Sequence, residues 1–355
     1  MAETEPLEGR GVVAPLETVD PLSDPRWAKL VSTAPSALVF HHPIWLRLIQ
    51  HHYGCSLGAW VVTALDGRLE CGLPFALMRS RLAGTRLVAL PYSDSCPLVV
   101  AQGSSVDPGA FSRGLAHESV RRGLDLEVRA TFPGGHGAHI GRTFLEHRLA
   151  LEFDVAAVER KFARGHRRGI TKAIRQGVVV ERRTDEDALR RFYPLHLATR
   201  RRQGLPTPSK RFILDLSQLF DAGLGFVMLA RQHGRDIAGA VFLTTGATLM
   251  YQLGASDVRF LRSNPNNLLL REAIRWGCET GHQTLHFGRT DLDNEGLRRF
   301  KRGWGTDEST LHCCRFGSPI QTSSGRSRKV LSRAISGGPP ILGRLVGAAY
   351  YRHCG

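Results

Sequence analysis

The chain has 355 residues, of which 42% are hydrophobic, a globular composition and a length that favours two domains. It has no run of 18 apolar residues and its N-terminus is acidic, so we expect neither a membrane-spanning helix nor a secretory signal. Seven cysteines form no CxxC pair and no zinc-ligand spacing, which predicts a reduced, cytoplasmic protein.

The net charge of +16 is concentrated in two segments. Residues 158–211 contain 16 Lys and Arg against 5 acidic residues, and residues 321–355 contain 6 against none. The rest of the chain is close to neutral. Focused charge raises the local concentration of anions, so this distribution predicts polyanion contacts at particular places.

The first half begins with residues 1–36, rich in Pro and acids, which we expect to be an extension that packs only in part. An apolar face ending at Gly54 predicts a helix over residues 42–54. Turn signals then separate strand-like runs. The remaining predicted elements are strands at 58–65, 69–80 and 85–93, a helix near 107–122, and strands at 124–131 and 147–153.

The second half begins with residues 154–177, predicted to form one long helix. Apolar residues at helical spacing would bury one face, while five cations line another. Like charges at that spacing repel, so the stripe destabilises the helix unless an anion neutralises it. The elements that follow are a strand at 178–183, helices at 185–203 and 208–222, strands at 225–232, 236–245 and 248–256, a helix at 264–281, and strands at 284–288 and 308–316.

Both halves therefore have the same order of helices, three antiparallel strands, a helix and a further strand. This order predicts an α+β fold in which one unit is used twice, each unit a mixed, mostly antiparallel sheet flanked by helices. We place the first domain at residues 37–153, the second at 154–317, and a basic tail at 318–355.

The stretch 287–305, FGRTDLDNEGLRRFKRGWG, carries most of the candidate chemistry. Asp291, Asp293 and Glu295 resemble the first half of an EF-hand loop, but Arg302 stands where the closing glutamate should be, so we expect no metal. The same acids fit the weak D-x-D pattern of a metal-dependent glycosyltransferase.

A helix start explains the acids of this stretch better. Asp293 or Asn294 would cap the helix, Glu295 would lie in its first turn, and an apolar face would pack inward. Spacing alone does not explain why Lys301 lies at the edge of that apolar face.

Several segments in order resemble the FemAB-like branch of the GNAT acyltransferase superfamily. They are HHPIWLRLIQHHYG, LPFALMRSRLAGTRLVALPYSD, the basic helix, YQLGASDVRFLRSNPNNLLLREAIRWGCETG and the stretch 287–305. The branch includes the aminoacyl transferases that form peptidoglycan bridges and acetyltransferase-like proteins associated with the envelope or with exopolysaccharide. Over about residues 37–316, the resemblance implies two tandem GNAT-like domains.

The resemblance also implies roles for particular residues. Phe300 and Lys301 match the family's Phe-Lys pair, in which the lysine lies in the substrate cleft, and Tyr251 matches its aromatic residue on the central strand. Asp291 is our candidate base, with Asp94 as a weaker one. The candidate substrate-binding residues are Phe300, Arg164, Arg168, Lys172, Asn266, Asn267 and Arg289.

The donor is left open between acyl-CoA and an aminoacyl-tRNA. GNAT enzymes hold the pyrophosphate of coenzyme A on a Gly-rich turn, but residues 262–267 here read RSNPNN. Asn264 or Asn266 can still cap the following helix, whose N–H groups favour an anion.

The implied activity is transfer of an acyl or aminoacyl group to an amine of an anionic envelope or exopolysaccharide precursor, nucleotide- or lipid-linked. With an aminoacyl-tRNA as donor, tRNA would be a further partner. The alternatives are a nucleic-acid-binding protein without catalysis and the D-x-D glycosyltransferase. We expect the basic tail to dock on the first domain or to rest on a membrane surface. The histidine pairs 41–42 and 51–52 are expected to lack a carboxylate partner, and His166 to pack in the core.

Overall fold

The computed structural model describes residues 16–80, 84–132 and 137–317, with residues 332, 334–338, 343, 346–347 and 350–351 of the tail. Its strands form one sheet in the order β1-β2-β3-β4-β6-β13-β7-β12-β11-β10-β9-β8, and β5 pairs with β3. The strands are β1 (Glu17–Val19), β2 (Ser56–Thr63), β3 (Leu69–Ser80), β4 (Gly84–Ala89), β5 (Val99–Val100), β6 (Leu126–Val128), β7 (His139–Ala150), β8 (Val179–Arg183), β9 (Gly225–Gln232), β10 (Arg235–Thr245), β11 (Thr248–Ser256), β12 (Thr284–Asp291) and β13 (Asp307–Phe316).

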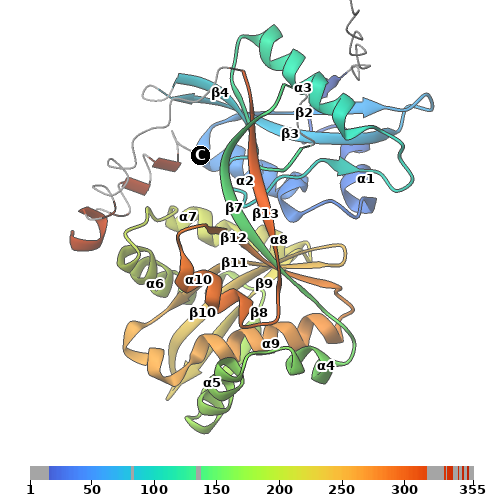
Figure 1. The fold of residues 1–355 in the computed structure, drawn as a ribbon. Coiled ribbons are helices and arrows are strands. Elements are labelled where there is room, and N and C mark those ends of the chain that lie inside the picture. Colours follow the sequence, from blue (N-terminus) through green and yellow to red (C-terminus); the bar gives the residue numbers. More distant parts are fainter. Residues whose placement is uncertain are drawn as a thin grey trace, which may run out of the picture.

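Helices cover both faces of this sheet (Figure 1). The α-helices are α1 (Pro25–Thr33), α2 (Pro43–Tyr53), α3 (Pro108–Arg122), α4 (Val155–Arg160), α5 (Arg164–Arg175), α6 (Glu186–Arg202), α7 (Lys210–Asp215), α8 (Ser217–Asp221), α9 (Pro265–Glu279) and α10 (Glu295–Arg302), and the 3-10 helices are η1 (Val39–His41) and η2 (Val258–Ser263).

The doubled unit predicted from the sequence is confirmed. In the first half β2, β3 and β4 are antiparallel, and β4 then pairs in parallel with β6 after the crossover through α3. In the second half β9, β10 and β11 are antiparallel, and β11 pairs in parallel with β12 after α9. The fold is α+β, with a mostly antiparallel sheet flanked by helices.

The two halves exchange their last strands. β7 follows the first half in sequence but pairs with β12 of the second half, and β13 ends the second half but pairs with β6 of the first. β7 and β13 also pair with each other, so they run side by side through the middle of the molecule (Figure 1). The exchange gives both halves one continuous sheet, while the boundary at residues 153 and 154 stays a prediction.

Two apolar cores lie on opposite sides of the second half of the sheet. One contains Trp45 of α2 together with Phe192 of α6 and Phe212 of α7, so it joins the two halves. The other contains Trp304 and Phe162 with the apolar face of α9. The second core anchors α5 and α10 to the same side of the sheet.

The single helix expected over residues 154–177 is wrong. Lys161, Phe162 and Ala163 separate α4 from α5. The turn after α10 packs into this break, where the N–H of Ala163 donates to the carbonyl of Gly303 at 2.7 Å. Phe162 is buried there against the ring of Trp304, with centroids 4.9 Å apart. A distant tertiary contact therefore breaks the helix that local periodicity favours.

The two ends of the described chain both pack on the domains. Residues 17–33 form β1 and α1, with Trp27 buried. In the tail, the ring of Tyr351 lies 6.0 Å from that of Tyr53, and its hydroxyl accepts a hydrogen bond from Arg200 at 3.0 Å. Tyr351 thus contacts both halves, whereas Ile341, Leu342 and Leu345 of the tail lie outside the described residues. None of the described helices is long and apolar enough to cross a bilayer.

We predict that Trp304→Ala lowers the free energy of unfolding by about 3–5 kcal/mol, because it opens a cavity where α5, α10 and the sheet meet. Urea unfolding followed by circular dichroism would measure it. The matched control is Phe153→Ala, since Phe153 is 83% exposed and its loss should change stability by less than about 0.5 kcal/mol. Equal effects of the two variants would contradict this packing.

Candidate active site

The candidate site is built around an opening between β11 and β12. Their parallel pairing covers only Thr248–Met250 against Thr284–His286, after which β11 continues with β10 and β12 with β7. The register of β12 against β7 shifts between His286 and Arg289, so β12 contains a bulge. Gly288 in this bulge has φ of 69°, a conformation that favours glycine.

Lys301 of α10 extends over the bulge. Its Nζ donates to the carbonyls of Gly288 at 2.9 Å and Arg289 at 3.1 Å, and the residue is only 3% exposed. Burial lowers the pKa of Lys301 from 10.5 to about 8, although the carboxylates of Asp94 and Glu146 act in the opposite direction. Because an ammonium has three N–H donors, one remains beyond the two carbonyl contacts.

Local sequence explains how α10 presents this lysine. The side chain of Asn294 caps the helix by accepting from the N–H of Leu297 at 3.1 Å, as the sequence predicts. Trp304, just beyond the helix, is fully buried and fixes its C-terminal end. The carbonyl of Phe300 accepts a hydrogen bond from His166 Nε2 at 2.8 Å, which joins α10 to α5.

A carboxylate from the first half lies against the bulge. A Cβ placed on Gly288 would lie 2.3 Å from Asp94 Oδ2, so only glycine leaves room for this side chain. The Nε of Arg289 is 3.8 Å from Asp94 Oδ1, and its guanidinium lies 4.6 Å from the ring centre of Phe144. Asp94, Arg289 and Lys301 therefore meet at one place.

A buried pair supports the other side of the bulge, and sequence reasoning did not find it. The N–H of Gly288 donates to His286 Nδ1 at 3.0 Å, so in the neutral imidazole the proton is on Nε2. That nitrogen lies 3.4 Å from Glu146 Oε1. Burial raises the pKa of Glu146, but the contacts with His286, Arg148 and Ser95 together lower it to about 2.

Tyr251 lies on β11 at the start of the opening. A Cβ on Gly254 would be 1.7 Å from the Tyr251 hydroxyl, so the phenol occupies the space that Gly254 leaves free. Burial raises the pKa of Tyr251 to about 12. Its carbonyl lies 4.0 Å from the Cβ position of Gly288, which places its backbone beside the bulge.

Asp291, the base predicted from the sequence, lies at the end of β12. Its carboxylate is 42% exposed and accepts a hydrogen bond from Arg142 at 3.0 Å. The structure thus brings Lys301 and Arg289 together, places the Phe300 ring against His166 and Trp304, and leaves Asp291 at the rim.

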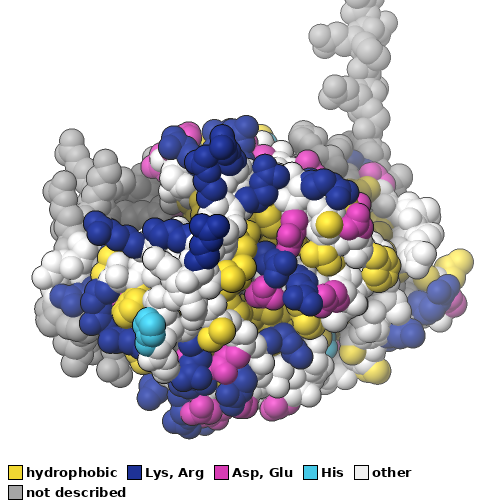
Figure 2. Space-filling view, turned by 90° about the horizontal axis from the view of Figure 1, so that it is seen from below, with side chains coloured by type: hydrophobic (Ala, Val, Ile, Leu, Met, Phe, Trp, Pro, Cys, Tyr) yellow, Lys and Arg dark blue, Asp and Glu magenta, His cyan; other side chains and the backbone are white. Residues whose placement is uncertain are grey.

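The basic stripe predicted from the sequence lies on α5. The exception is Arg160, which lies on α4 and pairs with Asp154 at 3.5 Å. The four stripe cations on α5 line a groove of about 540 Å³, and no described acidic residue forms an ion pair with them. Figure 2 looks onto this end of the molecule, where Lys and Arg side chains gather in several groups. We call this the α5 groove; its residues are Arg164, Arg167, Arg168, Thr171, Lys172 and Arg175.

The N-terminus of α9 lies against the α5 helix. A Cβ on Gly169 would be 3.1 Å from the Asn267 side chain, and Asn267 Nδ2 lies 3.1 Å from His166 Nδ1. Asn264 is the residue preceding α9, but its side chain donates to the carbonyl of Arg262 and does not cap the helix, contrary to one expectation. Asn266 is in the first turn of α9, and this turn faces His166 and Gly169 of α5, whereas the residues of the α5 groove lie at other positions of the helix and none of them belongs to α9.

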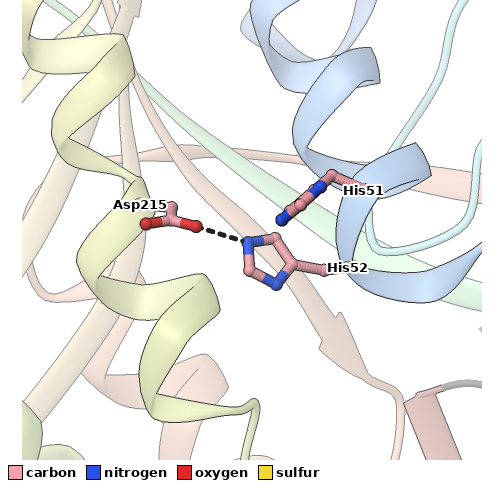
Figure 3. A group of neighbouring side chains, drawn as sticks. All are labelled: His51, His52 and Asp215. Carbon is pink, nitrogen blue, oxygen red and sulfur yellow. Dashed lines mark hydrogen bonds and ion pairs between the residues drawn. The ribbon is translucent and has the colours of Figure 1, made fainter.

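One group of side chains among the described residues has the donors to hold a metal ion. His51 and His52 of α2 and Asp215 of α7 place three ligand atoms within 4.8 Å of one another (Figure 3). His52 Nε2 lies 2.8 Å from Asp215 Oδ2, so the expectation that this pair lacks a carboxylate partner is wrong. Arg211 of α7 also contacts the Asp215 carboxylate, which therefore has two partners without an ion. The contact with His52 links α2 to α7.

Comparison with known proteins agrees with this geometry. Residues 160–302 match the family model described as an acetyltransferase (GNAT) domain. The crystal structure of FemX has a TM-score of 0.63 at 16% identity, covering 83% of this chain and 96% of that chain. No curated protein matches the sequence.

Two structures of lysylphosphatidylglycerol synthetases are similar as well. The C-terminal domain of a putative enzyme of this kind from Agrobacterium fabrum has a TM-score of 0.55 at 12% identity, covering 89% of this chain and 97% of that domain. L-PGS from Bacillus licheniformis has a TM-score of 0.53 at 12% identity, covering 90% and 97%. At these identities the likeness concerns the fold. Together with the matched domain, it shows a chain that carries a GNAT-type domain over residues 160–302 within a fold like that of FemX.

Proposed function

We propose that this acyltransferase moves an acyl or aminoacyl group to an amine of an anionic envelope or exopolysaccharide precursor. The observation that carries the proposal is Lys301, a buried cation fixed on the β12 bulge at the opening between β11 and β12. The fold shared with lysylphosphatidylglycerol synthetases is consistent with an envelope substrate. The uneven positive charge favours an anionic one.

The chemistry of aminolysis explains the need for such a cation. The amine nitrogen bonds to the acyl carbon, the carbon–sulfur or carbon–oxygen bond to the donor breaks, and the carbonyl oxygen becomes an oxyanion on the way. A fixed donor at that oxygen contributes about 2.7–4 kcal/mol to lowering the barrier. In our proposal the remaining N–H of Lys301 is that donor, and Tyr251 protonates the leaving group or positions the substrate.

The amine must also lose a proton, which requires a base near the bulge. Of the two carboxylates considered from the sequence, Asp94 now has the stronger case. The carboxylate of Asp94 lies against Gly288 and contributes to the negative charge around Lys301. The carboxylate of Asp291 is exposed and paired with Arg142. We therefore assign the base to Asp94.

The donor carries phosphate in either form that we consider, acyl-CoA or aminoacyl-tRNA. The first turn of α9, with Asn266 and Asn267, offers N–H groups beside His166 and Gly169 of α5. The α5 groove separately supplies Arg164, Arg168 and Lys172. Phosphate there would relieve the repulsion along the helix. An RNA donor would use more of the groove, since its backbone charge is extended.

The alternatives have weaker support. A D-x-D glycosyltransferase would need Asp291 free to bind a metal, but this carboxylate is paired with Arg142. A non-catalytic nucleic-acid-binding function would not explain why Lys301 is buried at the opening between β11 and β12.

Lys301→Ala should lower kcat for transfer about 10²–10³-fold, because it removes the donor at the oxyanion. Purified protein would be offered labelled acetyl-CoA and aminoacyl-tRNA in turn, with amine-bearing envelope precursors as acceptors. Lys29→Ala, on the exposed face of α1, is the matched control. Undiminished transfer by folded Lys301→Ala would remove this residue from the mechanism.

Asp94→Asn should lower kcat about 10²-fold or more, since it removes the proposed base. Asp291→Asn should change kcat less than about threefold, because its carboxylate lies at the rim. A larger loss of kcat in Asp291→Asn than in Asp94→Asn in the same assay would assign the base to Asp291.

The pH dependence of the free energy of unfolding should reveal the burial of Lys301 without an activity assay. The pKa of Lys301 is about 8 in the folded protein and 10.5 in its ordinary state, so between these pH values the unfolded chain binds more protons. The free energy of unfolding therefore gains on the order of 3 kcal/mol from this group as pH rises from 8 to 10.5.

Urea unfolding of the wild type and of Lys301→Met across this pH range isolates the effect. The difference in stability between them should move in favour of the wild type as pH rises. If the difference in the free energy of unfolding between the wild type and Lys301→Met did not change with pH, Lys301 would not be buried as a cation.

A further inference from the structure

The Glu146–His286 pair is a buried charged group that the proposed chemistry does not use. Glu146 is 7% exposed and His286 is 1% exposed. Carboxylates are almost never buried this deeply unless a partner compensates them, and burying such a pair is seldom stabilising by itself. A function other than stability would explain why it lies at this point in the sheet.

The Glu146–His286 pair is connected to Lys301 through the backbone of two residues, Gly288 and Arg289. Glu146 lies opposite Arg289 in the β7–β12 register, and the Arg289 carbonyl is one of the two that accept from Lys301. The other acceptor is the carbonyl of Gly288, whose own N–H donates to His286 Nδ1. His286 and Lys301 thus bind the N–H and the carbonyl of Gly288, while Glu146 lies on the strand paired with Arg289.

The tautomer of His286 depends on Glu146. Nδ1 must stay unprotonated to accept from the Gly288 N–H, which requires the proton on Nε2, and Nε2 faces the carboxylate at 3.4 Å. A neutral amide in place of the carboxylate would offer Nε2 a weaker acceptor. The proton would then be held less firmly on Nε2, which weakens the hydrogen bond from the Gly288 N–H to Nδ1.

Charge gives Glu146 a second effect on the lysine. The groups that face Lys301 are Asp94 from the loop before β5, Glu146 and His147 from β7, and the backbone of β12. Asp94 and Glu146 are the negative ones, and Arg289 already lies 3.8 Å from Asp94. Glu146, which Arg148 contacts at 3.4 Å, therefore adds to the larger contribution of Asp94 to the negative charge around this buried ammonium.

We infer that Glu146, acting through His286, is a positioning residue that holds the β12 bulge in the shape Lys301 needs and keeps that lysine charged. This inference rests on the proposed function of Lys301. It assigns Glu146 no contact with substrate.

A second His–Glu pair provides the matched control. His147, the next residue on β7, places its Nε2 3.1 Å from Glu308 Oε2, and Arg298 contacts the same carboxylate at 2.8 Å. This pair is also partly buried and near α10, but it has no hydrogen bond to Gly288 or Arg289. Glu308→Gln therefore removes a comparable charge without touching the bulge.

The first test is titration of Lys301 in the full chain by ¹³C NMR of labelled lysine. The chain has six lysines, and Lys301→Arg identifies the signal. Glu146→Gln should lower the pH midpoint of Lys301 by about one pH unit, and Glu308→Gln should leave it unchanged. Equal midpoints in wild type and Glu146→Gln would overturn the effect on charge.

The second test is kinetic. Glu146→Gln and His286→Asn should each lower kcat about 10–100-fold with the donor KM within twofold, as expected for groups that orient a reacting residue. His286→Asn keeps an acceptor for the Gly288 N–H and shows whether the effect depends on the link to Glu146. Unchanged kcat in Glu146→Gln, or the same loss in Glu308→Gln, would overturn the inference. If the wild type transfers no donor, the proposed function fails and the NMR titration alone decides this inference.

Discussion

The contact between the Lys301 ammonium and two carbonyls of β12 is the constraint on which the rest of the site depends. A buried cation is costly unless it is hydrogen-bonded and faces negative charge. The bulge supplies the carbonyls, and Asp94 and Glu146 supply the charge. Each of these features is needed because a lysine with 3% exposure must remain a cation beside reacting groups.

The exchange of strands between halves makes this arrangement possible. Lys301 and Gly288 belong to the second half, whereas Asp94 and Glu146 come from residues of the first. β7 brings Glu146 against β12 because it pairs with the second half although it follows the first. A GNAT unit alone would have the lysine and the bulge but neither carboxylate. The doubled fold thus assembles one site and not two independent ones.

Sequence reasoning located the elements well because their signals are local. The strands at 225–232 and 248–256 and the cap at Asn294 follow from alternation, turn residues and helix-start chemistry. It failed at residues 161–163, where a contact from Gly303 breaks a helix that periodicity favours. It also missed the His52–Asp215 pair, whose members are far apart in sequence.

The candidate site was predictable only in part for the same reason. Lys301 stands out because of its stretch and its resemblance to a known family. Glu146 carries no such signal, since the predicted strand at 147–153 begins just after it, whereas β7 spans His139–Ala150. Gly288 was an indirect clue, because a glycine inside a strand often marks a bulge.

The central claim is that Lys301 meets the negative charge of the reacting group in the opening between β11 and β12. A crystal structure with a non-transferable ketone analogue of whichever donor supports transfer would test it most directly. The account predicts the analogue's carbonyl oxygen within about 2.7–3.2 Å of Lys301 Nζ, with Nζ still on the Gly288 and Arg289 carbonyls. An analogue bound elsewhere, or bound in the opening with its carbonyl turned away from Lys301, would contradict the account.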